Sequence, residues 1–205
     1  MKQKTTLIIL AGGKSSRMGK PKGLLKHNHS FWILSQIESF IGTEVFIGLG
    51  HDYQSYQNAI PWLKEAILNP IKFNKKTIRA IINPTPELGL FSNLQSVLKH
   101  IDTNQEVLVL PIDVPLFNKQ EQEMIHEAKN QIVIPRYNGE KGHPVKLSTT
   151  FWSSLLEINP ANNNARLDSQ IKNKKASEIS LVETSDANCI KNLNTPKDWQ
   201  IFISS

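Results

Sequence analysis

The feature that most constrains this chain is a short apolar run near its start, which leads directly into a basic, glycine-rich loop. Leu7-Ile8-Ile9-Leu10 is followed by Ala11-Gly12-Gly13-Lys14-Ser15-Ser16-Arg17-Met18-Gly19-Lys20-Pro21-Lys22-Gly23. The run predicts a buried strand that ends in a turn. Because Gly12 and Gly13 lack a Cβ, backbone N–H groups there can approach an anion closely. Positive charge suited to phosphate oxygens comes from Lys14, Arg17, Lys20 and Lys22. The loop therefore predicts a polyphosphate site.

The spacing of this loop excludes two better-known phosphate-binding loops. A Walker loop has four residues between its glycines and then Gly-Lys-Ser/Thr. Here five residues separate Gly13 from Gly19, and Pro21 stands where the hydroxyl residue belongs. A dinucleotide loop needs Gly-x-Gly-x-x-Gly, and neither Gly12 nor Gly13 begins one. A phosphate loop of a third kind is left, with a basic surface turn as the plain alternative.

Strand-like and helical patterns alternate along the rest of the chain. Apolar runs predict strands over 6–10, 45–50, 78–82, 106–112 and 132–134. Apolar residues at helical spacing, or polar segments of helical character, predict helices over 30–40, 92–101, 119–130 and 149–158, with Ser92 as a cap of its helix. Segment 52–76 predicts a helix and an irregular excursion. This alternation predicts an α/β fold, Rossmann-like and three-layered, around a mainly parallel mixed sheet.

Ligands of such folds sit at the carboxyl ends of the strands, and four predicted strands end in residues suited to a site. Besides the glycine loop, these exits carry Gly48-Leu49-Gly50, Asn83 and Asp113. A carboxylate at a buried strand end is costly unless it is paired or binds a metal. Mg²⁺ is usually held by one or two carboxylates together with substrate phosphates. Asp113 is therefore a candidate Mg²⁺ ligand, and a turn or helix-cap aspartate is the alternative.

The loop pattern Leu-Ala-Gly-Gly-x-Ser-x-Arg-Met-Gly-x-x-Lys resembles the signature of the MobA-like NTP transferases. Later segments resemble further motifs of that family, in the family's order between residues 7 and 199. They are Asn83-Pro84 with Glu87-Leu88-Gly89-Leu90-Phe91-Ser92-Asn93-Leu94, Asp113-Val114-Pro115, Gly142-His143-Pro144-Val145, and Asn192-Leu193-Asn194-Thr195-Pro196-Lys197-Asp198. Taken alone, each has a structural explanation: Gly89-x-x-Ser92 is ordinary at a helix entry, His143 before proline is more often structural, and Thr195-Pro196 is a typical helix start.

The resemblance implies a nucleotidyltransferase fold and a role for each matching residue. The expected nucleotide-binding residues are Leu10, Ala11, Gly12, Gly13, Lys22, Asn83, Gly89, Ser92 and Asp113. Arg17, Lys22 and Asp113 would be catalytic, with Arg17 on the leaving pyrophosphate and Lys22 at the α-phosphate. Mg²⁺ would be the cofactor, bound by Asp113 with Asn192 or Asn194, neither of which supplies charge. His143 would contact or shape the site of the acceptor.

The implied reaction transfers a nucleoside monophosphate from CTP or GTP to the phosphate of the molybdopterin cofactor and releases pyrophosphate. The Ala-Gly-Gly loop and the Asn-x-Asn-Thr-Pro ending resemble the guanylyl branch. That branch has an asparagine where this chain has Gly48-Leu49-Gly50, and the segments around Asn83, Gly89 and His143 look more like the cytidylyl branch. The base stays open, with these features favouring CTP. The alternatives are a cytidylyltransferase acting on a sugar or polyol phosphate and a non-catalytic nucleotide-binding accessory protein.

Length, net charge and cysteine content limit the number of domains and the kinds of ligand and site that the chain can have. A length of 205 residues predicts one domain over residues 1–205. The net charge of +6 favours anionic ligands. The lysines and arginines form no long basic run and the basic loop lacks aromatics for stacking, so nucleic acid is not an expected partner. Cys189, the single cysteine, excludes an internal disulfide and a Cys-based zinc site. With no signal-like or membrane-spanning run, we expect a cytoplasmic enzyme that meets an NTP, a phosphorylated acceptor and, as a candidate partner, a molybdoenzyme or its chaperone.

Overall fold

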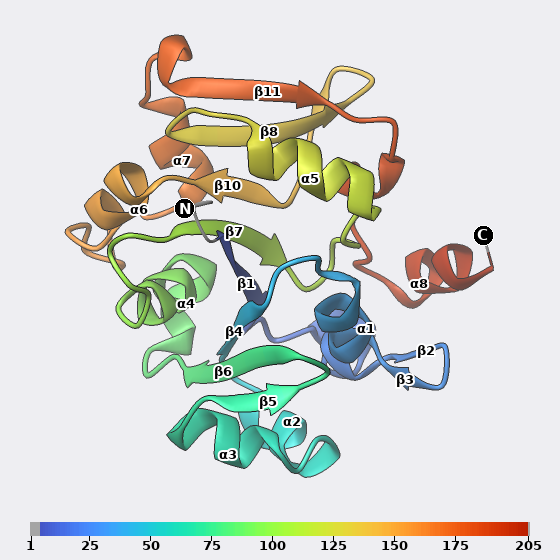
Figure 1. Ribbon diagram of the computed structural model, residues 1–205. Helices are drawn as coiled ribbons and strands as arrows, with labels where there is room; N and C mark the ends of the chain where they lie inside the picture. Colours follow the sequence, from blue (N-terminus) through green and yellow to red (C-terminus); the bar gives the residue numbers. More distant parts are fainter. Residues whose placement is uncertain (1–4, 205) are drawn as a thin grey trace.

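The first strand, β1 (Thr5–Ala11), lies in the middle of a nine-stranded mixed sheet in the computed structural model, which describes residues 5–204 (Figure 1). The other strands of the sheet are β4 (Glu44–Leu49), β5 (Ile71–Phe73), β6 (Lys76–Ile82), β7 (Glu106–Pro111), β8 (Ile132–Tyr137), β9 (Glu140–Lys141), β10 (Val145–Leu147) and β11 (Ile179–Glu183). A separate small hairpin pairs β2 (Lys26–His27) with β3 (Ser30–Phe31).

The strand order is β11-β8-β10-β7-β1-β4-β6-β5, and β9 pairs with β8. The centre is parallel, because β1 pairs in parallel with both β4 and β7, and β4 with β6. Antiparallel pairing enters through β10, which separates β7 from β8, and through β5 at one edge. The mainly parallel mixed sheet is therefore confirmed, and the parallel centre brings the carboxyl ends of β1, β4, β6 and β7 to one edge.

Eight helices are described within residues 5–204, and most of them cover the two faces of the sheet. They are α1 (Trp32–Ser39), α2 (Tyr53–Ala59), α3 (Leu63–Leu68), α4 (Gly89–Leu98), α5 (Lys119–Glu127), α6 (Thr149–Leu155), α7 (Leu167–Lys172) and α8 (Pro196–Ile203). Residues of α4 and α6 share one apolar core with a face of the sheet, while α1, α3 and α5 pack into the other (Figure 1). No helix in this part of the chain has the length and apolar character needed to cross a membrane.

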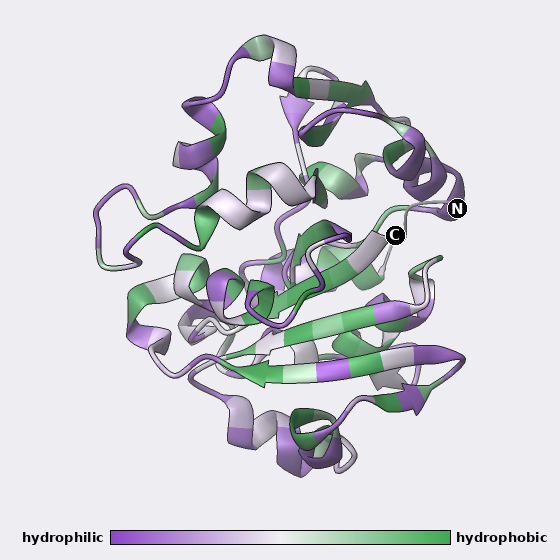
Figure 2. Ribbon diagram, turned by 60° about the vertical axis from the view of Figure 1, so that its left-hand side comes forward, coloured by the Kyte–Doolittle hydropathy of each residue, from purple (hydrophilic) through white to green (hydrophobic). Residues whose placement is uncertain are grey.

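Side chains of β1 alternate between the two cores, as a strand requires. Leu7 and Ile9 face the core that contains α1, and Ile8 and Leu10 face the core that contains α4. Because both faces are covered, the strand is apolar throughout, which explains the uninterrupted apolar run. Figure 2 shows the inner strands mostly in the green of apolar residues.

Some element boundaries differ from those that the sequence predicts. Ser92 does not cap its helix, because α4 begins at Gly89 and places Ser92 within its first turn. Segment 52–76 forms two helices and strand β5, which turns back onto β6. The helix predicted over 30–40 begins only at Trp32, because Ser30 and Phe31 form strand β3 of the small hairpin. Strands β10 and β11 carry no signal that distinguishes them from loops, since three residues are too few to show a period and β11 alternates between half-buried and exposed residues.

Candidate functional site

The loop after β1 is held in shape by its own turns before any ligand is considered. Ser15 has a left-handed backbone with φ 48° and accepts a hydrogen bond from Met18 N at 2.9 Å. Its Oγ accepts a second one from Lys22 N at 3.3 Å, which closes residues 15–22 into a compact turn. Beyond it, Gly23 N donates to the buried hydroxyl of Tyr56 at 3.1 Å. The loop is therefore anchored at both ends.

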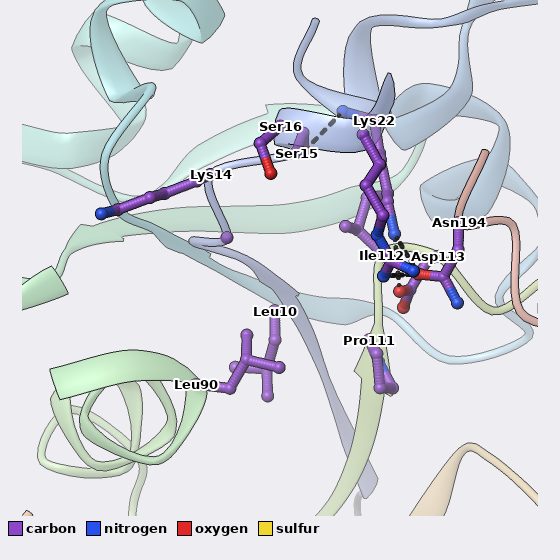
Figure 3. A pocket seen from close by; sticks show the side chains of 12 residues that line it. Leu10, Lys14, Ser15, Ser16, Lys22, Leu90, Pro111, Ile112, Asp113 and Asn194 are labelled. Atoms are coloured by element: carbon purple, nitrogen blue, oxygen red, sulfur yellow. Dashed lines mark hydrogen bonds and ion pairs between the residues drawn. The ribbon is translucent and has the colours of Figure 1, made fainter. Parts of the chain in front are cut away.

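Lys22 is the centre of the polar cluster at the mouth of the sheet. Its Nζ donates to Asp113 Oδ2 and to Asn194 Oδ1, at 2.8 Å in each case (Figure 3). Arg17 also donates to Asn194 Oδ1, at 3.2 Å. The side chain of Lys22 is 11% exposed and that of Asp113 is 25% exposed, so this ion pair is only partly screened by water. Segments far apart in the sequence thus meet at one ammonium group.

Asp113 is fixed by backbone contacts on both sides of the strand exit. Ile112 N donates to Leu10 O at 3.1 Å, which prolongs the pairing of β7 with β1. The indole of Trp32 donates to Ile112 O at 2.7 Å, and Leu193 N donates to Asp113 O at 2.8 Å. The last contact ties the segment before α8 to the strand exit, so Asp113 and Asn194 are positioned by the same junction.

Asn194 is positioned by the start of α8, where Thr195 and Asp198 form a capping box. Asp198 N donates to Thr195 Oγ1 at 3.2 Å, and Asp198 Oδ2 accepts from Thr195 N and Asn194 N at 2.8 and 3.1 Å. Hydrogen bonding of the Asp198 carboxylate by the Thr195 side chain, and then by the backbone N–H groups of Thr195 and Asn194, lowers its pKa, and the charge of Arg17 adds to the effect. The predicted helix start at Thr195-Pro196 is confirmed, and it holds Asn194 beside the loop cations.

The two loop glycines have different surroundings. A Cβ on Gly12 would collide with the side-chain amide of Asn93, and a Cβ on Gly48 would collide with the same amide. Asn93 is buried on α4, and its Nδ2 donates to Gly48 O at 3.2 Å. A Cβ on Gly13 would have no neighbouring atom within 4 Å, so this glycine faces open space. The protein's own packing requires Gly12, whereas only Gly13 is left open for a ligand.

Asn83 and Ser92, both expected at the nucleotide, are buried and bonded to each other. Asn83 Nδ2 donates to Ser92 Oγ at 2.8 Å, and Asn83 Oδ1 accepts from Thr85 N at 3.0 Å. Ser92 Oγ lies 2.9 Å from Gly89 O, to which it donates. These side chains shape the turn between β6 and α4. Gly89 itself is exposed, with φ 84°, a conformation that favours glycine.

The remaining predicted site residues lie at different distances from the cluster. His143 is half-buried and its backbone N donates to Cys189 O at 2.8 Å. Burial lowers the pKa of His143, and the charge of Asp113 opposes this shift. Asn192 is exposed, and its amide donates to Ile190 O at 3.2 Å, so of the two asparagines only Asn194 contacts the cluster. Ala11 lies in the core below the loop.

A pocket of about 190 Å³ opens at this cluster. It is lined by Leu10, Gly13, Lys14, Ser15, Ser16, Arg17, Lys22, Leu90, Pro111, Ile112, Asp113 and Asn194. Its wall thus combines cations and small loop residues with the apolar side chains of Leu10 and Leu90, which are labelled in Figure 3. Of the residues expected to bind nucleotide or metal, Ala11, Gly12, Asn83, Gly89, Ser92 and Asn192 do not line it.

The oxygen atoms of Asp113 and Asn194 fit a hard divalent cation such as Mg²⁺. Both atoms lie within hydrogen-bond distance of one cation, the Lys22 ammonium, so a positive charge is already accommodated between them. Within residues 5–204 there is no group of three or more His, Cys, Asp or Glu side chains that could hold a metal. A metal at this place would therefore depend on one carboxylate, an amide oxygen and oxygens of a ligand.

Sequence reasoning missed Leu90 and Asn93. Leu90 is 49% exposed in the first turn of α4 and lines the pocket, although the sequence predicts that this helix begins only at residue 92. Asn93 interacts with Gly48 and closely approaches Gly12, contacts that no local pattern reveals. Ser15 and Ser16 of the loop also line the pocket, and hydroxyl residues beside glycines were the available signal for them.

Comparison with known proteins identifies the family and the fold. The MobA-like NTP transferase domain matches residues 7–175. Rv0371c from Mycobacterium tuberculosis H37Rv superposes with a TM-score of 0.75 at 16% identity, over 100% of both chains. Its complex with manganese gives 0.71 and 14%, again over 100% of both chains. No curated protein matches the chain.

Two further solved structures have the same fold. Molybdopterin-guanine dinucleotide biosynthesis protein A from Archaeoglobus fulgidus superposes with a TM-score of 0.69 at 14% identity, over 97% of each chain. The 4-diphosphocytidyl-2C-methyl-D-erythritol synthase from Anaerococcus prevotii DSM 20548 gives 0.71 at 13% identity, over 100% of this chain and 98% of that one. Given these matches and the match over residues 7–175, the chain belongs to the MobA-like NTP transferase domain family and has the fold of a nucleotidyltransferase.

Proposed function

We propose that this nucleotidyltransferase transfers CMP or GMP from the corresponding NTP to the phosphate of a molybdopterin cofactor. A phosphate oxygen of the acceptor attacks the α-phosphorus, a new P–O–P linkage forms, and the bond to the β-phosphate breaks to release pyrophosphate. The attacking oxygen is already ionised near neutral pH, so no general base is required. The observation that carries the proposal is the convergence of Lys22, Arg17, Asp113 and Asn194 on one pocket beside Gly13.

Each residue of the cluster has a role in this reaction. Arg17 would hold the departing β- and γ-phosphates by paired hydrogen bonds. Lys22 would stabilise the negative charge that develops at the α-phosphate, and Gly13 would let the loop backbone approach the phosphates. Such reactions need positioning and charge stabilisation more than covalent chemistry. His143, near Asp113, would border the site of the acceptor.

Asp113 and Asn194 would hold Mg²⁺, which supplies positive charge to the phosphate oxygens when it is bound. Lys22 already occupies the space between these two oxygen atoms, which supports their suitability for a cation. Asn192 is the weaker of the two candidate asparagines, since its amide is directed to Ile190 O. Asn83, Gly89 and Ser92 would act on the base and ribose by shaping the turn before α4.

The base is the finer part of the proposal, and CTP is favoured over GTP. The exit of β4 carries Gly48, where a side chain would collide with Asn93. Gly48 itself offers no side chain to the base, and the guanylyl branch has an asparagine in the segment that matches Gly48-Leu49-Gly50. The TM-scores to the Archaeoglobus and Anaerococcus proteins are similar, so the fold does not distinguish CTP from GTP.

The test is a thermal-unfolding panel with CTP, GTP, ATP and UTP, each with Mg²⁺, followed by a pyrophosphate-release assay with candidate acceptors. A ligand that binds only the folded state at a hundredfold excess over its Kd adds about 2.7 kcal/mol of stability. One nucleotide that stabilises far more than the others identifies the base. Pyrophosphate release with a sugar or polyol phosphate would favour the alternative acceptor. Stabilisation without turnover on any acceptor would favour a non-catalytic accessory protein.

A further inference from the structure

The Lys22 ammonium occupies the place between the two oxygen atoms that are best suited to a divalent metal. It donates to Asp113 Oδ2 and Asn194 Oδ1 at 2.8 Å each. The largely buried position of Lys22 strengthens its attraction to the carboxylate, because little water screens the pair. In the absence of a ligand, these oxygens therefore already have a cation.

The surroundings of the pair oppose a free divalent cation. The pocket is lined by three cationic side chains, Lys14, Arg17 and Lys22, and by one carboxylate, Asp113, an excess of two positive charges. Asn194 Oδ1 accepts a second hydrogen bond, from Arg17 at 3.2 Å, so both of its lone pairs have partners. The same excess of positive charge attracts a nucleoside triphosphate, which is strongly anionic.

We propose that Lys22 is the resident cation of the Asp113–Asn194 oxygen pair, so that a divalent metal reaches this pair only together with a nucleotide. The phosphates of the nucleotide offer Lys22 new anionic partners, and Lys22 then leaves Asp113 Oδ2 free. Arg17 is drawn from Asn194 in the same way. Lys22 thus has two successive partners. It binds the Asp113 carboxylate when no nucleotide is bound and a phosphate of the nucleotide when one is bound. This inference rests on the proposed function, because it needs an NTP as the ligand.

The test measures Mn²⁺ binding without nucleotide by electron paramagnetic resonance titration. It compares the native protein with Lys22→Met, which keeps the side-chain length but removes the ammonium. Lys20→Met is the matched control, because Lys20 lies in the same loop, is exposed and does not line the pocket, while its loss changes the net charge equally. We expect Lys22→Met to bind Mn²⁺ at least about tenfold more tightly than either of the others, since a positive charge in direct contact is removed.

Two further variants locate the effect. Adding Asp113→Asn to Lys22→Met should abolish the gain in Mn²⁺ affinity, because the carboxylate is the main ligand. Lys22→Gln repeats the test if Lys22→Met does not fold, which circular dichroism would reveal. In the native protein, bound Mn²⁺ should rise at least about tenfold when CTP or GTP is added, beyond the amount bound by the nucleotide alone, and Asp113→Asn should remove this rise.

The outcomes separate the inference from the proposed function. Equal Mn²⁺ affinity in the native protein and the Lys22 variants, without nucleotide, overturns the resident-cation proposal. If the native protein still binds a nucleotide and releases pyrophosphate, the proposed function survives that result. If no nucleotide stabilises the protein and no pyrophosphate is released, the proposed function fails, whatever the Lys22 variants bind.

Discussion

The amide of Asn93 fills the space beside the Cα of Gly12, so the first glycine of the loop after β1 is required by the core of the protein itself. The same amide fills the space beside Gly48 and donates to the Gly48 carbonyl. Helix α4 thereby fixes the ends of β1 and β4 at once. The residue that positions the loop from below lies about 80 positions away in the sequence.

This contact predicts strong coupling between residues 12 and 93. Gly12→Ala should destabilise the protein by about 1–3 kcal/mol through overpacking, whereas Gly13→Ala should leave stability nearly unchanged. Asn93→Ala removes the amide that collides with the new methyl group, so the double variant Gly12→Ala/Asn93→Ala should recover most of the loss. Urea unfolding of the four proteins gives the coupling free energy. Additive effects of the two substitutions would contradict the packing explanation.

The turn between β6 and α4 predicts a structural role for Asn83. Asn83→Ala removes the amide that donates to the buried Ser92 Oγ and leaves the partly buried Thr85 N–H without its acceptor, so stability should fall by about 2 kcal/mol. The exposed Asn58→Ala is the control and should change stability little. Nucleotide affinity, measured by calorimetry, should fall in the Asn83 variant because the turn before Gly89 loosens. Full stability of Asn83→Ala would show that these bonds do not hold the turn.

Lys22→Ala should reduce kcat more than it weakens nucleotide binding, because Lys22 is proposed to stabilise charge that develops during transfer. Loss of one such group typically costs about 10²–10³ in kcat. Lys20→Ala serves as the control, since it removes the same charge outside the pocket. Steady-state kinetics and calorimetry together separate the two effects. A Lys22 variant with normal turnover and weak binding would assign Lys22 to binding alone.

The start of α8 predicts a link between a helix cap and turnover. Thr195→Ala should lower stability by about 1 kcal/mol, as loss of an N-cap does, and should also lower kcat because Asn194 is no longer fixed. Ser148→Ala removes the N-cap of α6 in the same way but lies away from the pocket. It should lower stability without changing kcat. Equal kinetic effects of the two substitutions would argue against a positioning role for the α8 cap.

Three histidines predict lower stability in acid. Burial is the main cause that lowers the pKa values of His27, His100 and His143 from 6.5. Below pH 6.5 the unfolded chain therefore binds more protons than the folded protein, and stability falls as the pH drops toward the folded-state pKa values. Urea unfolding at about pH 7.5 and about pH 5.5 measures this loss. His143→Gln should reduce the loss, because its imidazole is one of the three whose pKa burial lowers. An unchanged loss in this variant would contradict the contribution of His143.

The sequence by itself determined the central strands, the three-layer α/β class and the basic glycine-rich loop after β1, because apolar runs and glycine spacing are local signals. The family's motifs pointed to Asp113 and to the segment around Asn194, but not to which asparagine contacts the cluster. Only the tertiary structure brought Lys22, Asp113 and Asn194 together, since they come from three segments joined by the sheet and by the cap of α8. It alone directed Asn83 and Ser92 toward each other, because buried polar groups pair where the chain brings partners together. It also placed Asn93 under Gly12, because helix α4 packs against the ends of β1 and β4.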